Sequence, residues 1–194
     1  MPEETIHLIS AGLASEPATG APIEMLDDLA ARLARVFEIS CHVLASVVEV
    51  DFAHDPIRNQ HMSTSILARL AELREGELFV NESPGARLLG VTALDLFVPV
   101  LTFVFGEAQL DGRCGVVSTH RLREEHYGQP PNPELLAERL AKEAAHELGH
   151  TYGLRHCDDW SCVMASTHSV ERLDLKGVEF CASCGRVVRG DRRP

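Results

Sequence analysis

The sequence predicts an α+β protein in which a mixed, twisted β-sheet packs on helices. Short apolar and β-branched segments alternate with segments whose apolar residues recur at helical spacing. A long helix-forming segment without an internal proline then follows, over residues 133–152. The 194 residues suffice for one domain with a substantial core. We expect this domain over residues 1–185 and a basic, partly disordered tail over residues 186–194.

Two strands and two helices alternate in the first part of the chain. Thr5–Ser10 and Cys41–Val50 are rich in apolar and β-branched residues, which favours strands. Ile23–Phe37 and Ser63–Arg74 carry apolar residues three or four positions apart, which indicates helices with one buried face. The residues expected on these faces are Met25, Leu29, Leu33 and Phe37 in the first helix, and Ile66, Leu67, Leu70 and Leu73 in the second.

Three more strands are predicted before the long helix. Gly90–Val98 is the first, broken by Pro99, and Leu101–Phe105 is the second, ended by Gly106. Gly115–Thr119 is the third. The stretch 127–132, Tyr-Gly-Gln-Pro-Pro-Asn, is typical of a loop.

The predicted helix Pro133–Tyr152 is the central element. Asn132 suits the N-cap, Pro133 the first helical position, and Glu134 places an acid in the first turn. An apolar stripe repeats every four residues and predicts the buried side, formed by Leu136, Leu140, Ala144 and Leu148. His146 lies two positions after Ala144, about 200° around the helix. We therefore expect one side of the helix in the core and the other side in the floor of a cleft.

The motif His146-Glu147-x-x-His150-x-x-Gly153-x-x-His156 predicts a metal site on that second side. Histidines four residues apart project from one face of a helix, so one zinc ion can bind both His146 and His150. Gly153 is suited to ending the helix, because glycine readily takes a left-handed conformation. The chain can then return His156 to the same ion. Glu147 points to a different side and could act as a general base on zinc-activated water.

Four cysteines predict a second zinc site next to the first. Cys157 and Cys162 form a Cys-x4-Cys pair, and Cys181 and Cys184 form a Cys-x2-Cys pair. Four thiolates fill a tetrahedral zinc shell and leave no open position, so this site would be structural. Disulfides or free thiols are the alternative. The chain starts with an acidic Met-Pro-Glu-Glu and shows no secretory signal, so we expect a reducing cytoplasm, which disfavours disulfides.

Other polar residues carry weaker signals. Cys41 and Cys114 lie in apolar stretches and are expected to be buried and structural. Arg139 and Glu143 share the face of His146, where solvent exposure is the expected state. His126 is expected to be an exposed loop residue. No partner pattern is evident for the remaining histidines, which are His7, His42, His54, His61, His120 and His168.

The combined pattern resembles the archaemetzincins, a metzincin family with an added four-cysteine zinc site. The resemblance covers the specific motif over residues 146–184, including Cys162-Val-Met164. It implies a metzincin-like zincin fold, a catalytic zinc on His146, His150 and His156, and a second zinc on the four cysteines. Glu147 would be the general base, and Met164 would form a hydrophobic base below the zinc, although such a methionine is more often plain core. Phe103–Ala108 would be the sheet edge that binds substrate, with an ordinary core strand as the alternative.

The functional hypothesis is therefore a zinc metallopeptidase that carries two zinc ions and hydrolyses peptide substrates. The alternative is a metal-stabilised peptide-binding module with little or no catalysis, since loose placement of His156 would empty the catalytic site. A nucleic-acid-binding zinc ribbon is disfavoured by the formal charge of −11. No run of about 20 apolar residues is present, so no membrane span is expected.

Overall fold

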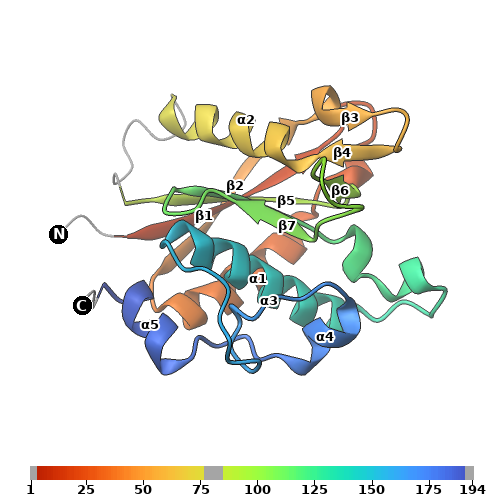
Figure 1. The fold of residues 1–194 in the computed structure, drawn as a ribbon. Helices are drawn as coiled ribbons and strands as arrows, with labels where there is room; N and C mark the ends of the chain where they lie inside the picture. Colours follow the sequence, from red (N-terminus) through yellow and green to blue (C-terminus); the bar gives the residue numbers. More distant parts are fainter. Residues whose placement is uncertain (1–3, 77–84, 191–194) are drawn as a thin grey trace.

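A five-stranded β-sheet forms the middle layer of the protein, with helices on both of its faces (Figure 1). The structure is a computed structural model, and it describes residues 4–76 and 85–190. The strand order is β2-β1-β5-β8-β7, and all neighbours are parallel except β7, which runs antiparallel to β8 at one edge. The strands are β1 (Thr5–Gly12), β2 (Ser40–Glu49), β5 (Arg87–Thr92), β7 (Gly106–Ala108) and β8 (Cys114–Ser118).

Helix α2 (Ser63–Glu75) covers one face of this sheet, and the other helices lie on the opposite face (Figure 1). These are α1 (Ile23–Phe37), α3 (Pro133–Thr151), α4 (Val170–Leu175) and α5 (Ala182–Val188). A small second sheet has the order β3-β4-β6. Its strands are β3 (His54–Asp55), β4 (Gln60–Met62) and β6 (Leu96–Phe97), and short 3-10 helices span Pro17–Thr19, Asp51–Ala53, His120–Leu122 and Glu124–Tyr127.

The sheet separates two hydrophobic clusters, because alternate side chains of each strand point to opposite faces. Ile6 and Leu8 of β1 pack toward α1 and α3, whereas Ile9 of the same strand packs with Ile66 and Leu70 of α2. The larger cluster contains the predicted buried side of the long helix, namely Leu140, Ala144 and Leu148 with Leu136 at its margin. The mixed sheet packed on helices is thus confirmed.

The ends of helix α3 follow their local sequence signals. The Asn132 side chain accepts a hydrogen bond from the Leu135 amide at 3.1 Å, which caps the first turn. At the other end Gly153 has φ of +83°, and the Leu154 amide donates to the Gly149 carbonyl at 3.3 Å. This left-handed ending reverses the chain. The residues after Gly153 therefore run back toward the face of α3 that carries His146.

Helix predictions were accurate, and strand predictions were mixed. Ile23–Phe37 matches α1, and Ser63–Arg74 stops one residue before the end of α2. The strands expected at Thr5–Ser10, Cys41–Val50 and Gly115–Thr119 correspond to β1, β2 and β8, with boundaries shifted by no more than two residues.

Two strand predictions were wrong. Gly90–Val98 is split into β5 and β6 by a turn in which the Thr92 hydroxyl accepts from the Leu94 amide at 3.2 Å. Leu101–Phe105 forms no strand, since the Leu101 amide closes a turn onto the Val98 carbonyl at 3.0 Å and only Val104 bridges to Leu96. Gly106 begins β7 and does not end a strand.

The C-terminal part of the chain contains two short helices that the sequence did not predict. Helix α5 includes Arg186, and its last residue, Val188, is buried against the core. The helix thus extends three residues past the expected domain boundary at residue 185, whereas residues 191–194 of the expected tail lie outside the described part. Within residues 4–76 and 85–190, no helix combines the length and the apolar character needed to cross a bilayer.

Candidate metal centres

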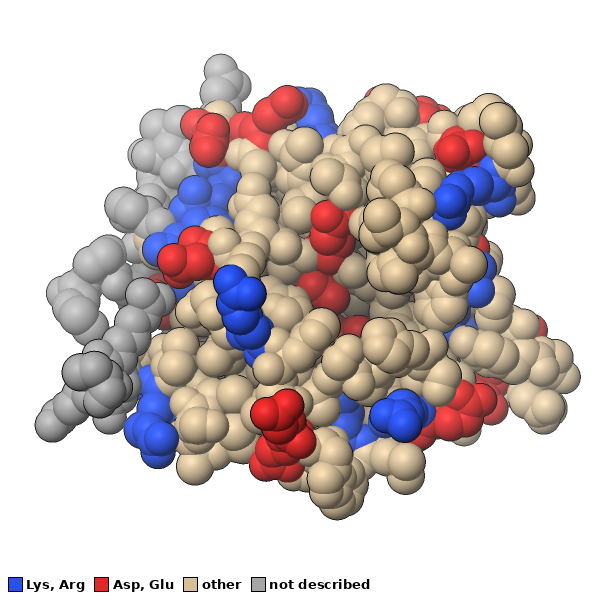
Figure 2. All heavy atoms as spheres, in the orientation of Figure 1, with Lys and Arg blue, Asp and Glu red and all other residues tan. Residues whose placement is uncertain are grey.

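A cleft of about 790 Å³ lies between helix α3 and the edge strand β7. His146, His150 and His156 line it together with Glu147, and Gly106 and Ala108 line it from β7. Figure 2 shows acidic side chains at the bottom of the hollow that crosses this face of the molecule. The predicted metal face of α3 is therefore the floor of a cleft, with a free sheet edge as its opposite wall.

The three histidines form one cluster whose ligand atoms lie within 4.8 Å of one another. The Nδ1 atom of His146 contacts the Val163 carbonyl at 2.8 Å, and that of His150 contacts the Leu154 carbonyl at 2.8 Å. A carbonyl can only accept, so Nδ1 carries the proton in both rings. Each Nε2 is then unprotonated and faces the cleft with a free lone pair.

The two Nε2 atoms of His146 and His150 lie 3.1 Å apart. In this tautomer neither can donate to the other, so two lone pairs face each other without a proton between them. A shared cation relieves this repulsion, and tetrahedral zinc would hold two imidazole nitrogens at about 3.3 Å from each other. The donor set therefore fits a zinc ion, with His156 as a third donor and one position left open. The loose placement of His156 that motivated the binding-module alternative is not observed.

Burial favours the neutral form of His146 and His156, which metal binding requires. Desolvation lowers the pKa of His146 well below its usual value, and the nearby charge of Lys176 acts in the same direction. Burial also lowers the pKa of His156, with a further contribution from His150. The lowered pKa values of His146 and His156 favour the neutral form of these rings, which is the form that binds a metal.

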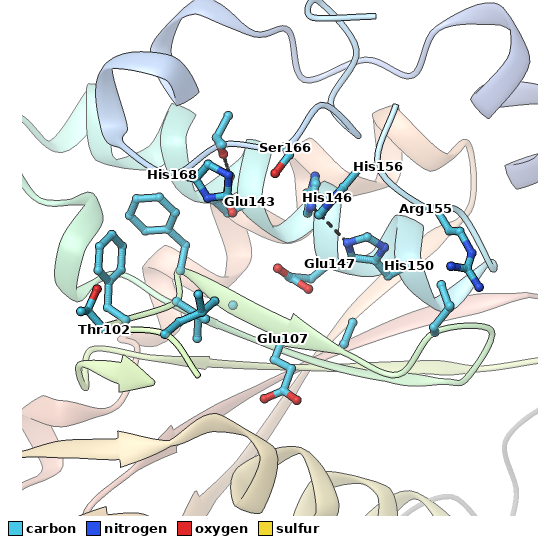
Figure 3. A pocket seen from close by; sticks show the side chains of 18 residues that line it. Thr102, Glu107, Glu143, His146, Glu147, His150, Arg155, His156, Ser166 and His168 are labelled. Atoms are coloured by element: carbon cyan, nitrogen blue, oxygen red, sulfur yellow. Dashed lines mark hydrogen bonds between the residues drawn. The ribbon is translucent and has the colours of Figure 1, made fainter. Parts of the chain in front are cut away.

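Glu147 is buried between α3 and the sheet and points into the cleft beside His146 and His150 (Figure 3). Its carboxylate rests against Gly106, where an added Cβ would come within 2.9 Å of Glu147 Oε1. Burial raises the pKa of Glu147 well above its usual value, and the neighbouring Glu143 adds to this shift. A carboxyl group with a raised pKa accepts and releases protons more readily near neutral pH, as a general base and acid must.

Arg139 and Glu143, expected to be solvated, are instead buried at 3% and 4% exposure. Glu143 Oε1 pairs with the Lys176 ammonium at 3.2 Å. Arg139 forms ion pairs with Glu124 at 2.6 Å and Asp174 at 2.7 Å. The solvated-face interpretation was wrong because two segments fold over this side of α3 and supply the partner charges. The segment after Met164 provides Asp174 and Lys176, and the segment before α3 provides Glu124.

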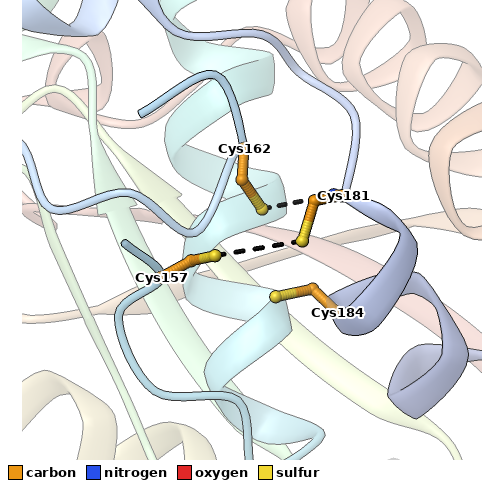
Figure 4. Close-up of side chains that lie close together, drawn as sticks. All are labelled: Cys157, Cys162, Cys181 and Cys184. Carbon is orange, nitrogen blue, oxygen red and sulfur yellow. Dashed lines mark hydrogen bonds between the residues drawn. The ribbon is translucent and has the colours of Figure 1, made fainter. Parts of the chain in front are cut away.

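The four cysteines form a second cluster, with all four sulfur atoms within 4.8 Å (Figure 4). Cys157 Sγ and Cys181 Sγ are 3.9 Å apart, close to the roughly 3.8 Å expected for two thiolates on tetrahedral zinc. That separation is far beyond a disulfide bond, and all six cysteines of the chain are free. Cys157 and Cys162 come from the loop after His156, whereas Cys181 and Cys184 come from the start of α5.

The environment of the cluster favours a thiolate at Cys181. The Ser183 hydroxyl and the Cys184 backbone amide hydrogen-bond to it and lower its pKa to about 6. Burial raises the pKa of Cys162 and of Cys184, so a bound cation would favour the thiolate form of both. Cys114, outside the cluster, is buried as predicted, and Cys41 is half-buried.

A short segment connects the two clusters. The Val163 carbonyl accepts from His146 Nδ1, and the next residue, Met164, accepts from the Cys157 amide at 2.9 Å. Met164 is fully buried, and its sulfur packs directly against Gly149 on the underside of α3. The predicted Met-turn residue therefore packs against the turn of α3 that lies between His146 and His150 in the sequence.

The apolar wall of the cleft comes from the segment wrongly predicted as a strand. Phe103 and Phe105 line it and contact each other edge-on at 5.3 Å between ring centres. The Arg121 guanidinium lies 4.3 Å from the Phe103 ring. Sequence reasoning gave no role to Lys176, Arg155 or His168, because no spacing pattern assigns one to them, whereas Glu107 lies in the segment predicted to bind substrate.

Known proteins are similar in sequence to this chain over most of its length. Residues 25–190 match the family described as Peptidase family M54. The archaemetzincin of Methanocaldococcus jannaschii is 37% identical over 169 residues, which cover 87% of this chain and 88% of that protein.

Two solved structures are similar in fold as well. The zinc-dependent peptidase from Methanocorpusculum labreanum has a TM-score of 0.80 at 28% identity, over 94% of this chain and 99% of that one. The archaemetzincin of Archaeoglobus fulgidus, solved as a complex with malonate, has a TM-score of 0.72 at 32% identity, over 95% and 99%. With its histidine and cysteine clusters each able to hold a metal, the chain belongs to the archaemetzincins, peptidase family M54, and is a zinc-dependent metallopeptidase.

Proposed function

We propose that His146, His150 and His156 bind the catalytic zinc and that Glu147 is the general base of peptide-bond hydrolysis. The opposed lone pairs of His146 and His150, 3.1 Å apart in a cleft, carry this proposal. When bound, zinc supplies Lewis acidity and lowers the pKa of water at the site. Glu147 takes the proton from the attacking water at its carboxylate and later delivers it to the leaving amine.

The proposed second zinc is structural and bound by Cys157, Cys162, Cys181 and Cys184. The sulfur separation of 3.9 Å and the lowered pKa of Cys181 support it. Two zinc ions per chain are therefore proposed, one catalytic and one structural. Because four thiolates require a reducing environment, the cluster also supports a cytoplasmic localisation.

The peptide substrate is proposed to bind as an extended strand along β7. This strand is at the edge of the sheet, and the edge that is not paired with β8 faces the cleft. An extended peptide can complete the unpaired backbone groups of such an edge. Met164 is proposed to be the hydrophobic base below the catalytic zinc, held there by its close contact with Gly149.

Glu147→Gln tests the proposed base. The amide keeps the shape of the side chain but cannot accept the proton of water, so we expect two zinc ions per chain and at least a 100-fold loss of kcat. Zinc content is measured by mass spectrometry, and cleavage is measured on a peptide that the parent protein hydrolyses. Glu138→Gln, on the same helix but outside the cleft lining, is the matched control. Full turnover by the Glu147 variant would eliminate this mechanism.

A further inference from the structure

One end of the cleft carries a single cationic side chain, Arg155. Among the described residues that line the cleft, it is the one lysine or arginine. It is exposed, and none of the ion pairs seen in residues 4–76 and 85–190 involves it. The whole chain has a formal charge of −11, so this cation does not belong to a generally basic surface.

The other charges of the cleft are already engaged. Glu107 accepts hydrogen bonds from Ser63 and Thr64, and Figure 3 shows its carboxylate directed away from the histidines. Glu143 is paired with Lys176, and Glu147 faces the histidine cluster. A ligand that reaches the far end of the cleft therefore meets the charge of Arg155 without a competing partner.

Arg155 lies at the end of the cleft where the N-terminal half of a bound peptide is expected. Figure 3 shows Arg155 beyond His150 at one end of the cleft and Thr102 at the other, with Glu107 between them on the opposite wall. The segment from Thr102 to Glu107, which leads into β7, therefore runs from the Thr102 end of the cleft toward the Arg155 end. A peptide paired antiparallel to β7, the more stable arrangement, runs the other way. Its N-terminal half lies near Arg155, and its C-terminal half lies along Phe103 and Phe105.

We propose that Arg155 is a specificity-determining residue that binds a carboxylate of the substrate, namely an Asp or Glu side chain on the N-terminal side of the scissile bond. This inference rests on the proposed peptide hydrolysis. The planar guanidinium fork matches a carboxylate with two parallel hydrogen bonds.

The test compares peptides that differ at one position. A cleaved sequence is blocked at both ends and carries Glu, Gln or Lys one to three residues before the scissile bond. A second set has a free C-terminal carboxylate, so that the two sources of a carboxylate are separated. Parent, Arg155→Ala and Arg155→Glu are assayed with Arg69→Ala as control, which removes the same charge from the exposed surface of α2. Zinc counting verifies that the neighbouring His156 keeps its ion.

The parent is expected to prefer Glu over Gln by roughly 5- to 50-fold in kcat/KM, mainly through KM, because Arg155 is exposed and partly screened. Arg155→Ala removes the preference, Arg155→Glu shifts it to Lys, and raised salt weakens it. An equal loss on the Glu, Gln and Lys peptides would overturn the proposal. A preference confined to peptides with a free C-terminus would reject the side-chain assignment.

A binding experiment separates this inference from the proposed catalysis. Zinc-loaded Glu147→Gln and Glu147→Gln/Arg155→Ala are titrated with the blocked peptides in a calorimeter. A Glu-over-Gln preference that disappears in the double variant supports Arg155 even where no peptide is hydrolysed. Hydrolysis by the parent without any such preference leaves the catalytic proposal intact and refutes the role of Arg155.

Discussion

At the scale of single residues, Gly106 determines how closely strand β7 approaches the Glu147 carboxylate. An added Cβ would lie 2.6 Å from the Val116 carbonyl and 2.7 Å from Glu147 Cγ. The first neighbour is backbone of the paired strand, which cannot move aside without disturbing the sheet. A side chain at this position must therefore displace either β7 or the general base that we propose.

Gly106→Ala is expected to lower kcat by roughly 10- to 100-fold, because a shift of about 1 Å in a catalytic group can cost this much. Overpacking should also lower the free energy of unfolding by about 1–3 kcal/mol. Gly90→Ala on β5 is the matched control, since its Cβ would overpack against the Leu70 side chain at 2.8 Å and its nearest neighbours do not include Glu147 or β7. Peptide cleavage and urea unfolding measure both effects. Parental kcat in the Gly106 variant would show that β7 does not constrain Glu147.

The residues of the two clusters were predictable because their spacing is local. His146 and His150 are one helical turn apart, and Cys181 and Cys184 flank the start of a short helix. Lys176 was not predictable, since its partner Glu143 is 33 residues earlier in the chain. The role of Arg155 was not predictable either, because it depends on which other charged side chains of the cleft are already paired.

At the scale of elements, the irregular segment before β7 is held in place by an ion pair outside the cleft. The Asp95 carboxylate accepts from Arg121 Nε at 2.6 Å and Nη2 at 2.8 Å. The same guanidinium lies 4.3 Å from the Phe103 ring, which lines the cleft. The pair therefore fixes one apolar wall of the cleft from behind.

Asp95→Asn is expected to lower the free energy of unfolding by about 1 kcal/mol at pH 7, allowing for partial exposure of the pair. Burial opposes ionisation of Asp95, but hydrogen bonds from Arg121 and Gln60 outweigh it and hold the pKa below the usual 3.8. A lowered pKa gives stability that is present above 3.8 and lost as the pH falls through the folded-state value.

The difference between parent and Asp95→Asn should therefore be constant from about pH 5 to 8 and shrink below about pH 4. Urea unfolding across this range measures it. Asp28→Asn is the control, because its exposed pair with Arg32 along α1 should contribute only about 0.3–0.5 kcal/mol. A difference that grows toward acidic pH would contradict the assigned pKa direction.

The helices were easier to predict than the strands for a physical reason. A helix is specified by its own periodicity and caps, as Asn132 and Gly153 show for α3. The segment Leu101–Phe105 has the apolar composition of a strand, but it forms a wall of the cleft. Its apolar residues line that wall and do not reflect pairing with another strand. Helices α4 and α5 are short, and their positions depend on tertiary contacts with α3 and the core.

At the scale of the whole molecule, the proposed structural zinc and the catalytic cleft depend on the same chain segment. The loop from His156 to Met164 contributes one histidine, two cysteines and the carbonyl that orients His146. Helix α5 supplies the other two cysteines from the C-terminal end. Loss of the cysteine site should therefore loosen the position of His156, although no cysteine faces the cleft.

Cys184→Ser is accordingly expected to weaken zinc binding at the histidine cluster by roughly 10- to 100-fold, as disruption of residues that support a metal site typically does. His150→Ala should lose one zinc ion and activity but keep the cysteine site, and Cys41→Ser, half-buried and outside both clusters, should keep two ions. The number of zinc ions per chain is measured at increasing chelator concentrations. Together with limited proteolysis of the C-terminal third, this measurement distinguishes the outcomes. Retention of the catalytic ion and parental activity by Cys184→Ser would mean that the two sites are energetically independent. The shared segment would then connect the two sites without coupling their affinities for zinc.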